Sequence, residues 1–356
     1  MDTTTSKPQV EQATDFITDS IQRGDFDVDS LLPSAETIAR DAECSVHAVR
    51  RAVRTLADEG LLKSVRGRGT TVLRKPYLGN VVMLLSRDAD SNTIFQFPVS
   101  HALYEAGFDV DIYAASFSNR SVERRLEEAV ENGGERPDAL VCIAPEGYGD
   151  DEKAAFKRYA MKFPARVFFQ YEPNVIAPPA FRVLCDPVHA SRCVVDHLLE
   201  LGHRRIAAHG GRFPGEGSSA ERRALTLRHL AEVAGAECHI FYGSLGQKES
   251  EFIRERGATA YWTMTDDAAL GAVNELLKAG ISVPEEVSVI GMNNTSLAEG
   301  HGISLTSVSL NPKAVAESMA EGLRTAHRGE GEFAEDGIYV KPELVARGST
   351  VAPPKS

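Results

Sequence analysis

From Asn80 onward the sequence alternates short apolar runs with longer amphipathic stretches, and this alternation constrains the fold more than any other feature of the chain. The apolar runs have the length of buried strands, and the stretches between them have the apolar spacing of helices. The predicted strands are Val81–Leu85, Val110–Tyr113, Ala139–Ile143, Val167–Phe169, Val183–Cys185, Ile206–Ala208, His239–Tyr242, Thr259–Thr263 and Val287–Gly291. Repeated strand–helix units predict an α/β fold, doubly wound around mainly parallel sheet with helices on both faces.

A break at Pro178-Pro179 interrupts this alternation and predicts two lobes instead of one long sheet. The helices expected between the strands are Val99–Glu105, Ser121–Val130, Ala154–Met161, Ala190–Leu201, Ala220–Val233, Glu249–Arg256 and Asp266–Ala279. We therefore expect a two-lobed unit over residues 80–352. Its first lobe would hold residues 80–174 with 312–338, and its second lobe would hold residues 175–311 with 339–352.

Residues 1–75 have a different pattern, which predicts a small helical domain. Ser34 can cap one short helix and Ser45 can cap a second, which Gly60 ends. On the second helix Val46, Val49, Ala52, Val53 and Leu56 share one face, and His47, Arg50, Arg51 and Arg54 share the opposite face. This order of a short helix, a tight connection and a basic helix is that of a helix-turn-helix.

A two-stranded hairpin is predicted directly after these helices. Leu61–Arg66 and Thr70–Leu73 can pair across Gly67-Arg68-Gly69, where the glycines permit the positive φ of a tight tip. Arg66 and Arg68 place positive charge at this wing. Residues 76–79, with a proline and a glycine, then read as a linker.

The distribution of charge favours a local contact with a polyanion. The chain of 356 residues has a net charge of −12, so a basic coat over the whole surface is excluded. Residues 44–75 nevertheless hold eight Lys or Arg against two Asp or Glu, a balance of +6, whereas residues 1–43 hold three against ten, or −7. Although an isolated basic helix face is often only a solvated surface, a basic island in an acidic chain indicates a nucleic-acid footprint.

Leu32-Pro33-Ser34, Ser45 with Arg50, Glu59-Gly60-Leu61 and Gly67-Arg68-Gly69-Thr70 resemble, in this order, the winged helix-turn-helix of GntR-type transcription regulators. The resemblance implies that Ser34, Arg50, Gly67 and Gly69 approach DNA. The sequence departs from the family pattern at two positions, because Glu36 and Val46 stand where the family usually has arginines. Each departure removes a contact with DNA that the family would be expected to make. The operator sequence of the family therefore cannot be assumed for this chain.

The second half of the chain is similar to the effector-binding domain of LacI/GalR-type repressors, which is related to periplasmic sugar-binding proteins. The stretches that carry this resemblance are His197–Ile206, Glu221-Arg222, Thr265–Gly271, Gly280–Gly291 and Arg347–Thr350. It covers residues 79–351 and is clearer over the second lobe. A GntR-type head on a LacI-type body resembles the arabinose-repressor architecture. This resemblance does not identify the sugar that the body would bind.

In such α/β folds ligands bind beyond the carboxyl ends of the strands, and this placement gives the candidate effector residues. Asn293 and Asn294 follow a strand where the family commonly has an aspartate, and Thr265 stands where the family has an asparagine. Gln170 and Arg87 follow two strands of the first lobe. Each could instead be an ordinary turn or loop residue, and Asp266 could cap the helix that follows it.

Two further candidates have open alternatives. Arg222 matches the family's ligand arginine, but Arg223 is the alternative because Leu225-Thr226 replaces the glycine–aromatic pair that fixes the alignment. An arginine there could bind two hydroxyls or a carboxylate. Trp262, the one tryptophan, could stack on a sugar ring or belong to the core.

We therefore expect a DNA-binding transcription regulator, in the repressor class, whose operator affinity changes when the body binds a small molecule such as a sugar. The expected partners are double-stranded operator DNA, the effector and a second copy of the chain, with no membrane, no metal and no cofactor. An enzyme is not expected, since Gly-x-Ser-x-Gly, Walker and His-Glu-x-x-His motifs are missing. The alternative is a transport-type sugar-binding protein, against which the basic head and the lack of an export signal both argue. Five scattered cysteines without a Cys-x-x-Cys pair are typical of a cytoplasmic protein.

Overall fold

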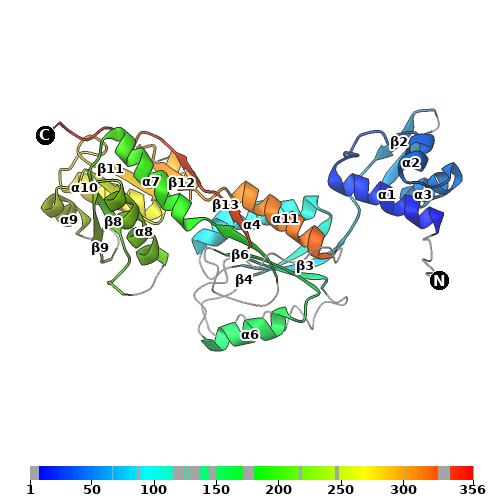
Figure 1. Ribbon diagram of the computed structural model, residues 1–356, viewed down its shortest axis with the longest axis horizontal. Helices are drawn as coiled ribbons and strands as arrows, with labels where there is room; N and C mark the ends of the chain where they lie inside the picture. Colours follow the sequence, from blue (N-terminus) through cyan, green and yellow to red (C-terminus); the bar gives the residue numbers. More distant parts are fainter. Residues whose placement is uncertain are drawn as a thin grey trace.

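The computed structural model describes residues 8–65, 67–85, 89–114, 124, 127, 137–143, 150–170, 180–215, 219–244, 248–300, 302–327 and 337–355. In Figure 1 the chain forms a small N-terminal head, then a first lobe, then a second lobe, arranged along the long axis of the molecule. We call residues 8–75 the head and residues 79–355 the body. Within the described residues no helix has the length and apolarity needed to cross a membrane.

The head is a helix-turn-helix with a hairpin, as predicted. Its elements are α1 (Gln9–Arg23), α2 (Ala35–Asp41), α3 (Val46–Asp58), β1 (Leu62–Val65) and β2 (Gly69–Val72). Ile17, Ile21, Ile38, Val49 and Leu56 form its core, all at most 1% exposed. The apolar stripe of α3 therefore faces α1 and α2, and this packing leaves the basic stripe on the surface.

The first lobe is a six-stranded sheet in the order β13-β7-β6-β5-β3-β4, with every neighbouring pair parallel. Its strands are β3 (Gly79–Leu85), β4 (Phe108–Ala114), β5 (Ala139–Ile143), β6 (Ala165–Gln170), β7 (Phe181–Cys185) and β13 (Ile338–Val340). Val81 and Met83 face α4 (Ala89–Glu105) and α11 (Pro312–His327). Val82 and Leu84 face α6 (Asp150–Ala160) on the other side, so alternate residues of β3 serve two cores.

The second lobe repeats this plan in the order β14-β12-β11-β10-β8-β9, in which only β14 runs antiparallel to its neighbour. Its strands are β8 (Arg205–His209), β9 (Glu237–Phe241), β10 (Ala260–Trp262), β11 (Ser288–Met292), β12 (Thr306–Ser309) and β14 (Glu343–Val345). Helices α7 (Pro187–Leu201) and α8 (Ser219–Val233) share the core on one face. Helices α9 (Glu249–Arg256) and α10 (Asp266–Lys278) cover the other face, and a short 3-10 helix, Ser296–Glu299, follows β11. The fold therefore has the two largely parallel sheets that the alternation predicted.

Two details differ from the sequence-based expectation. The boundary at residue 175 assigned the strand around Val183 to the second lobe, but β7 pairs with β6 in the first sheet. The double proline lies outside the described residues, and the chain crosses to the second lobe only where Asp186 caps α7. Helix α4 begins at Ala89 and includes Pro98, although a proline inside a helix removes one backbone hydrogen bond. The helix predicted over residues 121–130 falls largely outside the described residues.

Candidate DNA interface and effector site

Two serines fix the helices of the head through their hydroxyl groups. Ser34 Oγ accepts a hydrogen bond from the backbone N–H of Thr37 over 3.1 Å, and Ser45 Oγ accepts one from Ala48 over 3.2 Å. Both residues are N-caps, because each satisfies a backbone N–H that its helix leaves without a partner. The caps set where α2 and α3 begin, and hence which side chains of α3 point outward.

The outward face of α3 is basic, as expected. His47, Arg50, Arg51 and Arg54 are all exposed, whereas Ala48, Val49 and Ala52 are buried. A helix that presents only basic groups to solvent on one side can lie against the phosphates of a duplex.

The wing beside α3 is the hairpin β1–β2, in register from Leu62 opposite Val72 to Val65 opposite Gly69. At its tip Arg68 donates its backbone N–H to the carbonyl of Val65 over 2.9 Å. Gly67 and Gly69 have φ of 78° and 97°, values that favour glycine. The side chain of Arg68 is exposed at this tip, and Arg66, predicted beside it, lies outside the described residues.

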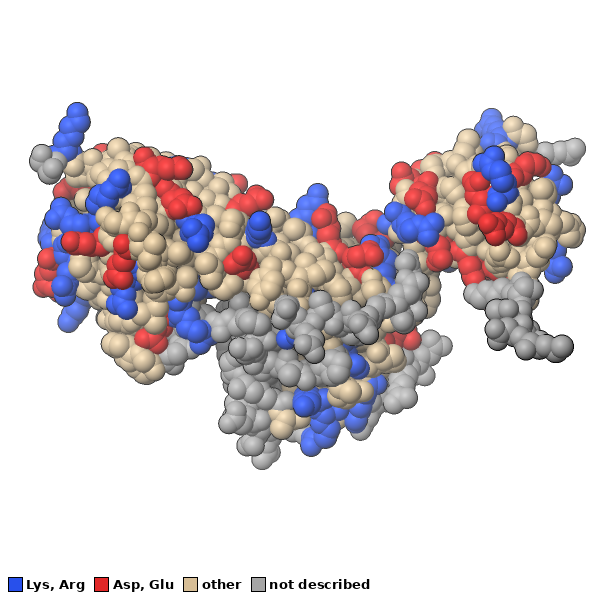
Figure 2. All heavy atoms as spheres, viewed as in Figure 1, with Lys and Arg blue, Asp and Glu red and all other residues tan. Residues whose placement is uncertain are grey.

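A groove of 520 Å³ separates the helices from the wing. Arg50, Arg54 and Ser34 line it from the helices, and Ser64, Gly69 and Thr70 line it from the wing. Figure 2 shows Lys and Arg interspersed with Asp and Glu on the visible face of the head, without a continuous basic coat. Contact with DNA would therefore depend on a few arginines.

One acidic side chain is bonded to an arginine that lines this groove. Glu36, in the first turn of α2, accepts a hydrogen bond from Arg50 over a distance of 3.2 Å from Nη2 to Oε1. Their side chains are 64% and 67% exposed. The backbone N–H of Glu36 and the hydroxyl of Ser34 lower the pKa of this carboxyl, and Arg50 lowers it further. The side chain of Glu36 is therefore a carboxylate at neutral pH.

In the second lobe the residues predicted to bind an effector gather at one edge of the sheet. Strands β8, β10 and β11 are neighbours and parallel, so the segments that follow them meet at the same edge. Asn293 and Asn294 follow β11 with φ of 96° and 49°. This left-handed backbone is one that asparagine tolerates better than most residues.

The two asparagines have different partners. Oδ1 of Asn294 accepts a hydrogen bond from Arg347 over 2.6 Å, and its backbone N–H donates to Ser307 Oγ over 3.0 Å. The backbone N–H of Asn293 donates to Val308, but no other described residue bonds to its side-chain amide. The side chain of Asn293 is therefore available to a ligand, whereas that of Asn294 belongs to the fold.

Asp266 organises this edge without facing a ligand. Its carboxylate accepts hydrogen bonds from the N–H and the hydroxyl of Thr295 and from the hydroxyl of Ser307, over 2.6, 2.9 and 2.5 Å. Burial raises the pKa of Asp266, and these donors oppose the rise. Gly291 allows the approach, because a Cβ there would lie 2.6 Å from Asp266 Oδ1. The helix cap is Thr265 instead, whose hydroxyl accepts from the N–H of Ala268 over 3.1 Å.

The structure distinguishes the two candidate arginines of α8. Arg222 is exposed, whereas Arg223 is 7% exposed and donates from Nη1 to the sulfur of Met292 over 3.2 Å. Met292 ends β11 directly before Asn293. Arg223, the alternative in the sequence, is therefore the guanidinium that lies beside the asparagine.

Trp262 is a core residue in the structure. It is 2% exposed and packs in the core that α7 and α8 share with the sheet, so its ring does not offer a face to a sugar. The remaining candidates belong to the first lobe. Gln170 ends β6, but its side chain is outside the described part of the chain, and Arg87 lies outside it altogether.

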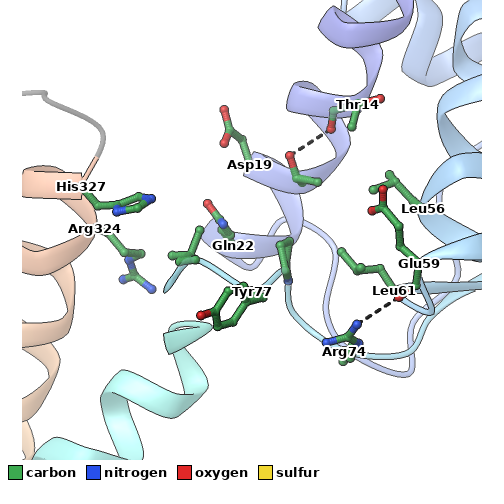
Figure 3. A pocket seen from close by; sticks show the side chains of 13 residues that line it. Thr14, Asp19, Gln22, Leu56, Glu59, Leu61, Arg74, Tyr77, Arg324 and His327 are labelled. Carbon is green, nitrogen blue, oxygen red and sulfur yellow. Dashed lines mark hydrogen bonds between the residues drawn. The ribbon is translucent and has the colours of Figure 1, made fainter. Parts of the chain in front are cut away.

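The linker and the ends of α1, α3 and α11 enclose a cavity of 640 Å³ between the head and the body (Figure 3). Gln22 lines it from α1, Tyr77 from the linker, and Arg324 and His327 from α11. Arg74, two residues before the linker, holds the end of the head against the C-terminus of α3, since its guanidinium donates to the carbonyls of Glu59 and Gly60 over 3.0 and 3.4 Å. The segment that leads into the linker is therefore bonded to the residues that end the basic helix.

Comparisons with known proteins match each part of the chain. Residues 9–72 match the family described as bacterial regulatory proteins, gntR family, and residues 195–350 match the periplasmic binding protein-like domain. The arabinose metabolism transcriptional repressor of Geobacillus stearothermophilus is 24% identical over 96% of this chain and 98% of its own length. An uncharacterized HTH-type transcriptional regulator of Streptomyces limosus, from the aml 5' region, is 30% identical over 71% of this chain and 73% of its own.

Among solved structures, the lac repressor dimer bound to operator and the anti-inducer ONPF has a TM-score of 0.63 and 19% identity. The similarity covers 78% of this chain and 96% of that one. It shows that the body has the fold of that repressor.

Proposed function

Since the chain belongs to the helix-turn-helix transcription regulators that join a GntR-type head to a periplasmic-binding-protein-like body, we propose that it represses genes of sugar metabolism and responds to a sugar. One observation carries the proposal: a winged head with an exposed basic helix and a two-lobed body occur in one chain. Such a protein acts on the chromosome, in the cytoplasm. The alternative of a transport-type binding protein gives the head no role.

The chemistry of the second-lobe edge supports a sugar as the effector. Arg223 can fork to two hydroxyl oxygens, and the amide of Asn293 offers both a donor and an acceptor. Both residues lie next to Met292: Arg223 donates a hydrogen bond to its sulfur, and Asn293 follows it in the sequence. The relative from Geobacillus stearothermophilus is named for arabinose metabolism, which makes pentoses the first sugars to test.

We propose that the DNA-binding form is a homodimer that reads two half-sites. The surface groove between α4 and α11 supports this assignment. It has a volume of 500 Å³ and is lined by Phe97, Pro98, His101 and Ala316, among others. Phe97 and Tyr104, two turns further along the same helix, are 74% and 67% exposed, and large exposed apolar side chains on one face of a helix mark an interaction surface.

The effector can change operator affinity only if it binds two arrangements of the body with different affinities. The direction we propose is release, in which the sugar favours the arrangement that does not hold the two heads at their half-sites. Arg74 and the linker connect the body to α3 and are the route for this change.

The experiment has two arms on the purified full-length protein. A thermal-shift screen of pentoses, hexoses and sugar acids should find a ligand that raises the unfolding temperature by mass action. A gel-shift titration with genomic fragments should find a duplex whose affinity falls steeply with salt, and Arg50→Ala should weaken that complex by about 1–3 kcal/mol. A protein that binds no genomic fragment would contradict the regulator, and one that binds only apolar ligands would contradict the sugar.

A further inference from the structure

The ion pair between Glu36 and Arg50 has no evident role in the stability of the head. Both side chains are about two-thirds exposed, and exposed ion pairs stabilise proteins little. The pair also does not belong to the core of the head, which other residues of α2 and α3 form. Arg50 lines the groove between the helices and the wing, and the carboxylate bonded to that arginine is the feature that requires an explanation.

A carboxylate at this position is unfavourable for general DNA binding. Affinity for any duplex depends on cations that neutralise phosphates, and Glu36 both repels phosphates and occupies the guanidinium of Arg50. Replacing the pair by a free arginine would therefore raise affinity for random sequence. A residue that lowers general affinity can still raise the ratio between the correct and the incorrect sequence.

The base edges of the major groove provide that distinction. Guanine presents acceptors at N7 and O6, thymine an acceptor at O4, and adenine an N6 amino donor beside its N7 acceptor, whereas cytosine presents only a donor, its N4 amino group. A carboxylate is repelled by guanine and thymine and favours cytosine over adenine, because cytosine has no acceptor beside its donor. An arginine beside it can donate to a guanine through two hydrogen bonds.

We propose that Glu36 determines operator specificity, by accepting from a cytosine amino group while Arg50, held beside it, donates to a guanine of the same or the neighbouring base pair. This inference rests on the proposed function. It deepens that function by assigning the base that the first turn of α2 selects. In the free protein Glu36 orients Arg50. The two side chains would therefore enter the major groove of the DNA together and contact the bases as a pair.

The test is a selection of duplexes from a pool with randomised positions, made with the full-length wild-type protein and with Glu36→Gln. The control is Asp41→Asn, which removes the same charge from the other end of α2, where Asp41 pairs with Arg40 over 2.9 Å at the surface. Thermal unfolding of each variant confirms that it is folded.

Wild type and Asp41→Asn should enrich the same motif, with the same C·G base pair fixed at one position of each half-site. Glu36→Gln should lose the preference for that cytosine, and its affinity ratio between the selected duplex and random sequence should fall by roughly tenfold. Its affinity should also depend more steeply on salt, because the freed Arg50 gains a phosphate.

The inference fails if Glu36→Gln enriches the wild-type motif with the wild-type ratio. It also fails if Asp41→Asn changes the motif as much as Glu36→Gln does, because the effect would then be one of net charge. A wild-type protein that enriches no duplex would overturn the proposed function and this inference together, so the two failures are distinguishable.

Discussion

Arg347 donates a hydrogen bond to Oδ1 of Asn294 across 2.6 Å, and this contact separates the roles of two consecutive asparagines. The guanidinium of Arg347 is also bonded to the carbonyl of Leu305, and its side chain is only 13% exposed. Asn294 thus joins the loop after β11 to the C-terminal segment. The side-chain amide of Asn293, one residue earlier, has no such bond to another described residue, and we propose that it binds the effector.

Asn294→Ala should destabilise the second lobe by more than Asn293→Ala does. A hydrogen bond to a charged group contributes about 1.5–3 kcal/mol, and Asn294→Ala removes one from a mostly buried arginine. Both substitutions replace asparagine at positive φ, so backbone strain lowers the stability of both variants, and only Asn294→Ala also loses the hydrogen bond. Urea unfolding followed by circular dichroism measures the difference, and equal losses in the two variants would contradict the assignment.

Arg223→Ala should shift the response to the sugar to much higher sugar concentrations than the wild type requires. A buried polar partner left unpaired costs about 1–3 kcal/mol, which corresponds to a tenfold to hundredfold weaker affinity. Arg222→Ala is the matched control, because Arg222 is the exposed neighbour on the same helix. Isothermal titration with the sugar found by screening gives both dissociation constants. A larger effect of Arg222→Ala would restore the first of the two sequence alternatives.

Stability should fall as the pH falls below about 6.5, the ordinary pKa of histidine. Burial lowers the pKa of His203, whose ring nitrogens bond to Thr259 Oγ1 and to the carbonyl of Val351, each over 2.8 Å. Because the depressed pKa belongs to the folded state, the unfolded chain takes up the proton first. The contribution of His203 is therefore complete above pH 6.5 and is lost as the pH falls through its lower folded value.

His197 adds to this pH dependence, since burial lowers its pKa too. Unfolding temperatures measured between pH 8 and pH 5 should decline less steeply in His203→Gln than in the wild type. His229→Gln, at an exposed histidine of α8, should follow the wild-type curve. Parallel curves for all three proteins would show that His203 is not the group responsible.

The sequence predicted the fold because its signals are local. Serines at positions 34 and 45 precede apolar periodicity and cap helices, and the alternation of strands and helices determines both sheets. The site was less predictable, because its side chains are fixed by distant partners. Asp266 is held by Thr295 and Ser307, which are 29 and 41 residues away. No local pattern identifies such partners.

The choice between Arg222 and Arg223 shows the same limit. Adjacent positions on a helix point about 100° apart, so an alignment uncertain by one residue exchanges an exposed side chain for a buried one. Only the packing of α8 against β11, through Met292, decides which arginine faces the sheet. The strand order likewise required the structure, because the pair Pro178-Pro179 in the sequence suggests a domain boundary before β7, whereas β7 pairs with β6.

Arg74→Met should uncouple the head from the body while leaving each able to bind its own ligand. The substitution keeps an unbranched side chain and removes the donors to Glu59 and Gly60 at the end of α3. Without them the body no longer constrains the orientation of the basic helix. Operator affinity should then change little when sugar is added, because the coupling free energy between the two sites is lost.

Operator titrations with and without saturating sugar, made on wild type, Arg74→Met and Arg40→Met, measure this coupling. Arg40, an exposed arginine of α2 that bonds to Asp41, controls for the lost charge in the head. We expect the ratio of the two operator affinities to approach one in Arg74→Met and to stay near wild type in Arg40→Met. Calorimetric titration should show that Arg74→Met binds the sugar about as tightly as the wild type does. Any difference should be no larger than the factor by which the sugar changes operator affinity in the wild type. A wild-type ratio in Arg74→Met would place the coupling elsewhere, in the contacts that line the cavity between Gln22, Tyr77 and Arg324.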